Sequence, residues 1–116
     1  DAKNIRREFK FGMFRSASDF TQNKELSELV RDRKIYIQGS IDLIIENRDG
    51  SIYVCDYKTD RVSPEEAANP ALLRERMRTS HKDQLEQYKY AVQKILNRAP
   101  DKIFILSLSS GLAVEI

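Results

Sequence analysis

The spacing of apolar and polar residues is strand-like over most of the first half of the chain. Residues 5–13 (IRREFKFGM) alternate loosely between apolar and charged side chains, which predicts a first strand with one solvated face. Residues 34–46 (KIYIQGSIDLIIE) are rich in β-branched residues and almost continuously apolar, so we expect a long central strand there. The polar stretch between them predicts only a short turn of helix around Lys24–Val30.

A tight turn follows the central strand. Residues 47–50 (NRDG) end in an Asp-Gly pair, and both residue types tolerate the positive φ angles of a hairpin turn. Residues 51–59 (SIYVCDYKT) then predict an antiparallel return strand. With the turn centred on the Asp-Gly pair, paired residue numbers sum to about 99, which brings Asp42 close to Asp56 or Tyr57.

The next part of the chain carries helical signals. Residues 60–79 are highly charged and are interrupted by an Asn-Pro pair, so we expect an excursion with one or two short helices. Residues 81–99 repeat apolar side chains at helical spacing. They predict an amphipathic helix that Ser80 caps and Asn97 ends.

The chain closes on apolar residues. Residues 102–111 (KIFILSLSSG) predict a further strand, and residues 112–116 predict a short last one. Strand, long hairpin, helix and strand in this order indicate an α/β fold, in which a mixed β-sheet with a long central hairpin is flanked by helices. A length of 116 residues suits a single domain over residues 1–116.

The composition excludes several classes of protein but does not indicate a particular reaction. Twenty basic and eighteen acidic residues give a net charge of +2, which is too balanced to indicate nucleic-acid binding by itself. The single cysteine, Cys55, excludes an internal disulfide framework and a cysteine zinc cluster, so we expect a reducing, cytoplasmic setting. No apolar run approaches the roughly 20 residues of a membrane span. The chain opens without an initiator Met, and we interpret it as part of a longer one.

Three charged residues interrupt the apolar strands of the hairpin. Asp42 lies within GSIDLII, and Asp56 and Lys58 share one face of the return strand. Side chains of paired residues are about 5 Å apart, so two carboxylates there repel each other unless a cation lies between them. Mg²⁺ prefers oxygen ligands and would supply that cation, and Lys58 could hold an attacking water or offset charge on a phosphate. The alternative is a plain cross-strand salt bridge, with Asp42 reaching solvent at a sheet edge.

The predicted helix offers further candidates. Gln84 and Tyr88 lie one turn apart and project from one face. Either Tyr88 is a core aromatic and Gln84 a surface residue, or both reach over the carboxylates. In the second case Gln84 bonds a phosphate or a water, and Tyr88 positions Lys58 or DNA. His81, the only histidine, is expected at the surface or as a helix cap.

Other residues have two interpretations. Glu8 is a third acidic contributor to the site or, more simply, a solvated strand residue, and Cys55 is expected to pack in the core. Four basic residues between the hairpin and the helix form either a solvated face or a track for a nucleic-acid backbone; they are Arg74, Arg76, Arg78 and Lys82.

Taken together, GSIDLII, CDYKTD and QLEQYKYAV resemble the nuclease domain of the RecB/AddA type, within the Asp-(Asp/Glu)-x-Lys restriction-endonuclease-like superfamily. The resemblance covers roughly residues 35–96, and the Thr-Asp ending of DYKTD is more similar to AddA than to RecB. The matching residues are Gly39, Asp42, Asp56, Tyr57, Lys58, Thr59, Asp60, Gln84, Leu85 and Tyr88.

The resemblance implies a Mg²⁺-dependent DNA exonuclease or endonuclease domain, with Mn²⁺ as a possible substitute, at the C-terminal end of an ATP-dependent helicase–nuclease that repairs double-strand breaks by recombination. The partners that it implies are DNA, the helicase domains of the parent chain and a second helicase–nuclease subunit. ATP would act only in the helicase part, since the sequence contains no Walker-type loop. The implied metal ligands are Asp42, Asp56 and the backbone carbonyl of Tyr57, and the implied catalytic residues also include Lys58, Gln84 and Tyr88.

One feature departs from the family pattern. Family members bring a histidine or acidic residue from a helix before the first strand, and this sequence predicts no such helix. Either that helix precedes these residues, or the site is incomplete. The alternative function is a degenerate nuclease fold kept for DNA binding or subunit contact, which would bind no divalent metal. A free-standing restriction-like endonuclease is disfavoured because no sequence-reading element is evident.

Overall fold

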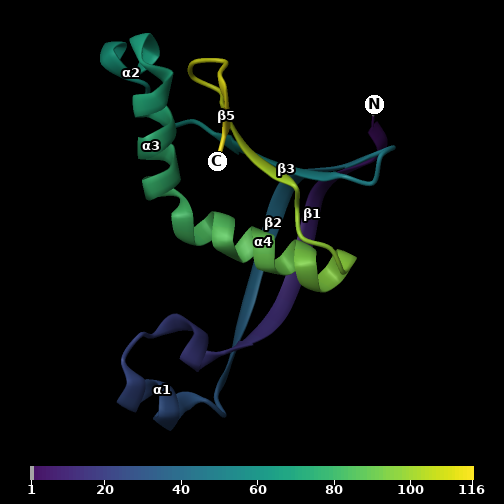
Figure 1. Cartoon of the computed structure of the whole chain (residues 1–116), viewed down its shortest axis with the longest axis vertical. Coiled ribbons are helices and arrows are strands. Elements are labelled where there is room, and N and C mark those ends of the chain that lie inside the picture. The colour runs from purple at the N-terminus through teal and green to yellow at the C-terminus, as the bar shows by residue number, and fades with distance from the viewer. Residues whose placement is uncertain (1) are drawn as a thin grey trace. The chain divides into compact units, whose positions relative to one another are not determined.

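The chain folds around a mixed β-sheet whose strands follow the order β1-β2-β3-β4-β5 (Figure 1). The structure is a computed structural model and describes residues 2–116. These residues divide into two compact units, one formed by the chain up to Phe9 together with Ile41–Ile116, the other by Lys10–Ser40. The strands are β1 (Ala2–Ser16), β2 (Lys34–Asn47), β3 (Ile52–Lys58), β4 (Lys102–Ser107) and β5 (Ala113–Glu115). The helices are η1 (Ala17–Phe20), α1 (Lys24–Val30), α2 (Pro64–Ala68), α3 (Pro70–Ser80) and α4 (Lys82–Leu96).

The predicted hairpin is confirmed. β2 and β3 pair antiparallel with Glu46 opposite Ile52 and Leu43 opposite Cys55, so paired numbers sum to 98. At the turn, the Gly50 backbone N–H donates to the Asn47 carbonyl at 2.9 Å. Gly50 has a φ of +90°, which glycine adopts without the steric cost that a side chain would add.

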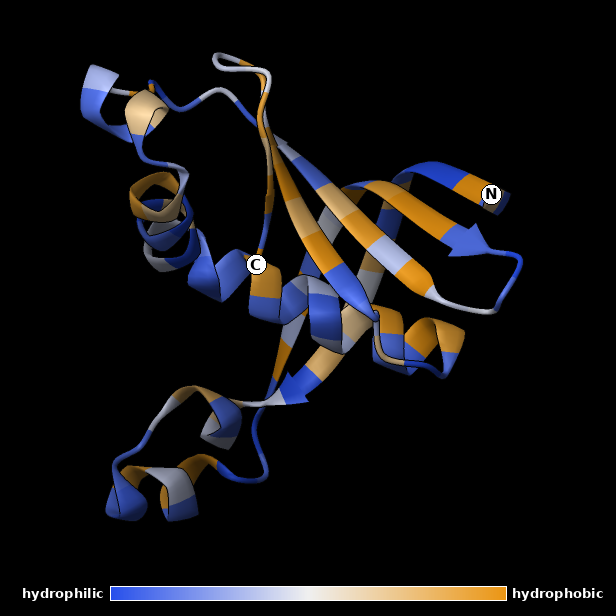
Figure 2. Ribbon diagram, turned by 45° about the horizontal axis from the view of Figure 1, so that its top comes forward, coloured by the Kyte–Doolittle hydropathy of each residue, from blue (hydrophilic) through white to orange (hydrophobic). Residues whose placement is uncertain are grey.

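The predicted mixed sheet is also confirmed. β3 pairs parallel with β4, Val54 lying opposite Ile103, and β5 returns antiparallel along β4. Parallel neighbours need a long crossover, and α2, α3 and α4 fill the one between β3 and β4. Hydropathy colouring shows apolar residues concentrated along the strands and alternating with polar ones on the helices (Figure 2).

The core of the larger unit joins sheet residues to residues of α3 and α4. On the strands, Ile44, Val54 and Ile105 have no exposed surface. Leu73 and Met77 of α3 are equally buried, so this helix packs an apolar stripe although its sequence carries charges on most faces. The prediction of one or two short helices is confirmed, because Asn69-Pro70 separates α2 from an 11-residue α3.

Ser80 does not cap α4, and that prediction was wrong. Ser80 is the last residue of α3, and the chain turns at His81, whose backbone N–H bonds the Met77 carbonyl at 3.1 Å. α3 therefore takes up Ser80, and the residue before α4 is His81, whose side chain makes no capping hydrogen bond. The predicted end of α4 is confirmed: Asn97 has a φ of +58°, the left-handed conformation that ends many helices.

The smaller unit, Lys10–Ser40, contains the end of β1 and the start of β2 with η1 and α1 between them. Phe11 and Met13 are its buried apolar residues on β1. α1 has the predicted bounds and begins where Asn23 Oδ1 accepts a hydrogen bond from the Leu26 backbone N–H at 3.0 Å. The sequence did not predict η1.

None of the helices that the structure describes is both long and apolar enough to cross a membrane.

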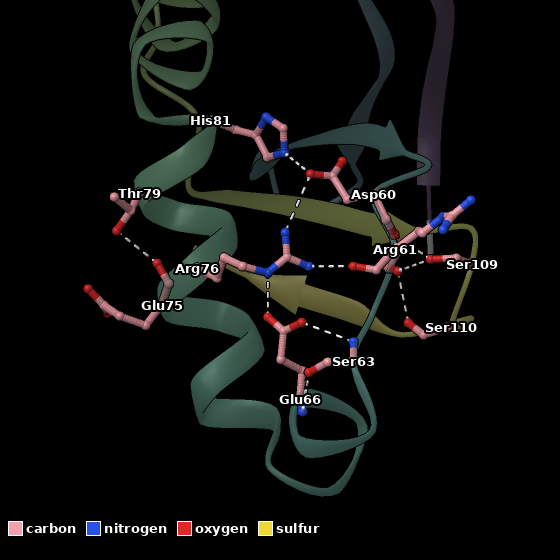
Figure 3. A network of polar contacts seen from close by, with 11 residues as sticks. Asp60, Arg61, Ser63, Glu66, Glu75, Arg76, Thr79, His81, Ser109 and Ser110 are labelled. Atoms are coloured by element: carbon pink, nitrogen blue, oxygen red, sulfur yellow. Dashed lines mark hydrogen bonds and ion pairs between the residues drawn. The ribbon is translucent and has the colours of Figure 1, made fainter.

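A capping box and an ion pair stabilise α2. The Ser63 hydroxyl accepts from the Glu66 backbone N–H at 3.1 Å, and Glu66 Oε1 accepts from the Ser63 N–H at 3.1 Å. The other Glu66 oxygen, Oε2, accepts from Arg76 Nε on α3 (Figure 3). Arg76 and the Ser63 N–H hold the pKa of the Glu66 carboxyl below its usual value of 4.5. The ionised carboxylate therefore links α2 to α3.

We expect Glu66→Gln to lower the melting temperature at neutral pH, because glutamine keeps the cap but loses the ion pair with Arg76. The pKa of the Glu66 carboxyl is lower in the folded protein than in the unfolded chain. The ionised carboxylate therefore stabilises the folded state at pH values above the unfolded-state pKa, and this stabilisation is lost as the pH falls through the folded-state pKa. The difference between wild type and variant should therefore shrink below about pH 4.5. Thermal unfolding followed by circular dichroism from pH 7 to pH 3 measures this. Glu65→Gln, at an exposed neighbour, is the control; a pH-independent difference would contradict the ion-pair account.

Candidate active site

The β2–β3 hairpin brings two aspartates together in the larger unit. The pairing runs as far as Leu43 opposite Cys55. The next residues of the two strands are Asp42 and Asp56, and their side chains interact with each other. Asp42 Oδ2 accepts a hydrogen bond from the Tyr57 backbone N–H at 2.8 Å. Asp56 is only 2% exposed. The hairpin thus places one carboxylate in a buried position and a second beside it.

Asp56 is electrostatically strained. Burial raises the pKa of its carboxyl, and the neighbouring Asp42 adds to that rise. Lys58 works in the opposite direction: its Nζ lies 2.8 Å from Asp56 Oδ2. Because the pKa stays raised despite Lys58, the surroundings as a whole disfavour a charge on Asp56.

Lys58 connects the strand to the helix. Its ammonium donates to Gln84 Oε1 on α4 while it pairs with Asp56 on β3. Its side chain is 17% exposed, so the charge lies mostly inside the protein. Gln84 is exposed, as the surface interpretation expects, and it also contacts Lys58, as the site interpretation requires.

Tyr88 is both a core aromatic and a neighbour of the carboxylates. The residue is 5% exposed and lies on the buried face of α4. Burial raises the pKa of its phenol to about 12, with further contributions from the charges of Asp56 and Asp42 and from a hydrogen bond to Asp56. The phenol therefore stays protonated at neutral pH and can act as a donor to Asp56.

The donor set fits a hard divalent cation. Asp56 Oδ2 is buried, and among residues 2–116 no donor reaches it with hydrogen-bond geometry, the Lys58 contact being an ion pair. A buried, incompletely satisfied carboxylate oxygen beside a second carboxylate suits Mg²⁺, which takes oxygen ligands. Within this described range, no group of three His, Cys, Asp or Glu side chains is arranged to hold a metal. Glu8 in particular is exposed.

The four basic residues that follow the hairpin do not share one environment. Arg76 points toward α2 and the loop after β3, where it contacts Glu66, Asp60 and the Arg61 carbonyl (Figure 3). The others are exposed on α3 and α4, and Arg78 lies 4.0 Å from Glu75; these exposed residues are Arg74, Arg78 and Lys82.

Two further outcomes concern residues near the site. Cys55 is half-buried instead of packed in the core, because it lies on the strand face opposite to Asp56 and Val54. His81 was expected at the surface or as a helix cap; it occupies the N-cap position of α4 but is half-buried and makes no side-chain capping hydrogen bond. Its Nε2 instead lies 3.0 Å from Asp60 Oδ2. Sequence reasoning missed this pair. Its only signal is that Asp60 follows Lys58 by two residues and His81 precedes Gln84 by three.

Comparison with known proteins agrees with this geometry. The sequence profile of the PD-(D/E)XK nuclease superfamily matches residues 2–114. An ATP-dependent helicase/nuclease subunit of Lysinibacillus sphaericus (strain C3-41) is 35% identical over 106 residues, which are 90% of this chain and 8% of that protein. Its counterpart in Thermoanaerobacter sp. (strain X514) is 29% identical over 114 residues, or 98% of this chain and 8% of that protein. The chain thus spans about 8% of the length of these curated relatives. The resemblance and the fold class expected from the sequence are confirmed.

We expect Asp56→Asn to raise the melting temperature of the metal-free protein at neutral pH. The asparagine removes a buried charge that its surroundings disfavour while keeping the shape of the side chain. Thermal unfolding of the chain in buffer with a chelator measures the effect. Asp32→Asn, at an exposed aspartate, is the control and should leave the melting temperature unchanged. A lower melting temperature for Asp56→Asn would mean that the Lys58 ion pair outweighs the burial of the charge.

Proposed function

The chain belongs to the PD-(D/E)XK nuclease superfamily, and from this premise we propose that it forms a single nuclease domain that hydrolyses DNA phosphodiester bonds with Mg²⁺ or Mn²⁺. The observation that carries the proposal is the arrangement of Lys58 between buried Asp56 and Gln84, with Asp42 on the paired strand. A simple salt bridge between Lys58 and Asp56 would not require a second carboxylate at Asp42 or a contact with Gln84 on α4.

Asp42 and Asp56 would hold the cation through their carboxylates, and the backbone carbonyl of Tyr57 would add a ligand. When bound, a divalent cation polarises the phosphate and makes water a better nucleophile at neutral pH. The described residues supply two acidic side chains, so a third protein ligand would come from another part of the parent chain.

Lys58 supplies a fixed positive charge. Its contacts with Asp56 and Gln84 hold the ammonium in place, so little reorganisation is needed when negative charge grows on the phosphate. The same ammonium can hold a water for attack. Gln84 acts through Lys58, because its Oε1 accepts from Nζ and directs the remaining N–H groups.

Tyr88 supports the carboxylates from the helix. Its neutral phenol donates to Asp56 and adds no negative charge to a site that already holds two acids. This contact orients the Asp56 carboxylate from the side of α4, while Lys58 does so from β3. We therefore include Tyr88 among the active-site residues.

The whole-protein role is proposed from the names of the relatives, which are helicase/nuclease subunits. We propose that the parent protein is cytoplasmic, unwinds DNA ends with ATP in its helicase domains and prepares them for recombinational repair together with a second subunit. The exposed Arg74, Arg78 and Lys82 are proposed to contact the DNA backbone. Arg76 contributes less, because Glu66 and Asp60 already engage its guanidinium.

One observation favours a second candidate, a degenerate nuclease fold used for DNA binding or subunit contact. No third metal-ligating side chain joins the two aspartates within residues 2–116. This alternative keeps the fold but predicts that the parent protein binds no divalent cation at the hairpin.

We expect Lys58→Ala to reduce DNA cleavage by the full-length parent protein by at least about 10²-fold, because a preorganised charge near the phosphate is lost. Mn²⁺ binding, measured by calorimetry, should persist in Lys58→Ala and disappear in Asp56→Ala, since only the second removes a ligand. Lys89→Ala, at an exposed lysine of α4, is the control for cleavage.

Near-normal cleavage by either Lys58→Ala or Asp56→Ala would sink the proposed mechanism. Absence of both cleavage and Mn²⁺ binding in the wild type would favour the degenerate fold.

A further inference from the structure

A second cluster of polar side chains lies beside the proposed active site and takes no part in the proposed mechanism. Asp60, in the loop after β3, accepts contacts from two sides through Oδ2 (Figure 3). His81 Nε2 lies 3.0 Å away, at the junction of α3 and α4. Arg76 of α3 places a guanidinium nitrogen 3.7 Å away. The cluster therefore joins a strand end to the helical crossover.

Arg76 also binds the loop and the helix before it. It donates to Glu66 of α2, and its second terminal nitrogen donates to the Arg61 carbonyl at 2.7 Å. From the other side, the Ser109 hydroxyl donates to the Asp60 carbonyl at 2.5 Å. The loop that follows Lys58 is thus held through the side chain of Asp60 and through the backbone carbonyls of Asp60 and Arg61.

The sequence positions of Asp60 and His81 show which two segments their contact joins. Asp60 is two residues beyond Lys58, and His81 is three residues, just under one helical turn, before Gln84. The Asp60–His81 contact and the Lys58–Gln84 contact therefore join the same two segments, the end of β3 and the start of α4. The His81 carbonyl also accepts from the Leu85 N–H at 3.0 Å, so His81 belongs to the first turn of that helix.

The Lys58–Gln84 contact alone would hold this junction weakly. Lysine and glutamine side chains are long and flexible, and fixing both costs conformational entropy. Asp60 and His81 are shorter, and their side chains are 25% and 18% exposed. Arg76 adds a planar group with several donors that ties the loop to α3.

We propose that Asp60, Arg76 and His81 are positioning residues that hold the start of α4 against the end of β3 and so keep Gln84 on Lys58. Their effect on catalysis rests on the proposed nuclease function, whereas their effect on the helix start does not. None of the three is among the residues proposed to contact the metal or the phosphate. They act through Gln84.

A double-mutant cycle tests this route in the full-length parent protein. Asp60→Ala should lower kcat about 10- to 100-fold with little change in KM, because misplacing a catalytic group affects the transition state more than binding. In a Gln84→Ala background the same substitution should cost less than about 3-fold, since the group it positions is already gone. Equal costs in both backgrounds would overturn the proposal.

Conservative variants separate positioning from general damage to the fold. His81→Ala should reproduce the loss, whereas His81→Gln keeps an N–H donor that can reach Asp60 and should restore most of kcat. Asp60→Asn keeps an acceptor oxygen for His81 and serves as the milder variant if Asp60→Ala does not fold. Asp32→Ala, at an exposed aspartate, should leave kcat unchanged. No rescue by His81→Gln would contradict the proposal.

Hydrogen exchange of the same proteins without metal gives a readout that does not need nuclease activity. Asp60→Ala should speed exchange at residues 85–88, the first amides with hydrogen bonds inside α4, several-fold and leave residues 91–96 unchanged. If the wild type does not cut DNA, the proposed function fails, and this exchange still decides whether Asp60 positions α4. Unchanged exchange at residues 85–88 would overturn the positioning role in either case.

Discussion

The structure depends on how it keeps the carboxylate of Asp56 inside the protein. This residue is 2% exposed and follows the buried apolar residues Ile52 and Val54 on the same strand face, and burial raises its pKa. A buried charge needs partners, and here they are Lys58, two residues along the strand, and Tyr88 from the helix. Lys58 in turn needs Gln84. The packing of α4 on the sheet therefore depends on the contacts that the Asp56 carboxylate requires.

The two neighbouring carboxylates destabilise the fold, and contacts from the helices hold them in place. The hairpin turn places two acids side by side, where they repel each other in the absence of a cation. The α3–α4 junction then fixes the helix that brings Gln84 and Tyr88 to the acids. We interpret the resulting strain at Asp56 as a cost of function, of the kind that active sites commonly impose on stability.

Much of the fold and the centre of the site could be predicted from local signals. The Asp-Gly turn sets the hairpin register to within one residue, and continuing that register past Leu43 and Cys55 brings Asp42 beside Asp56. The left-handed Asn97 likewise marks a helix end by its residue type. Such features depend on neighbours in the sequence, so short-range reasoning reaches them.

The remaining features depend on contacts between distant residues. Ser80 is a good cap by residue type, but packing of Leu73 and Met77 extends α3 through it. Arg76 resembles its exposed basic neighbours in sequence and differs only because Glu66 and Asp60 face it in space. The Asp60–His81 pair spans 21 residues and has no pattern of its own.

We propose that the hairpin carboxylates bind the divalent cation of a nuclease. Fe²⁺ in place of Mg²⁺, with ascorbate and peroxide, cuts a polypeptide next to the bound metal and so locates the cation site in the full-length parent protein. We expect backbone cleavage close to Asp42 and Asp56, suppressed by excess Mg²⁺ and absent in Asp56→Ala. Cleavage confined to other parts of the chain, or unaffected by that substitution, would contradict the claim.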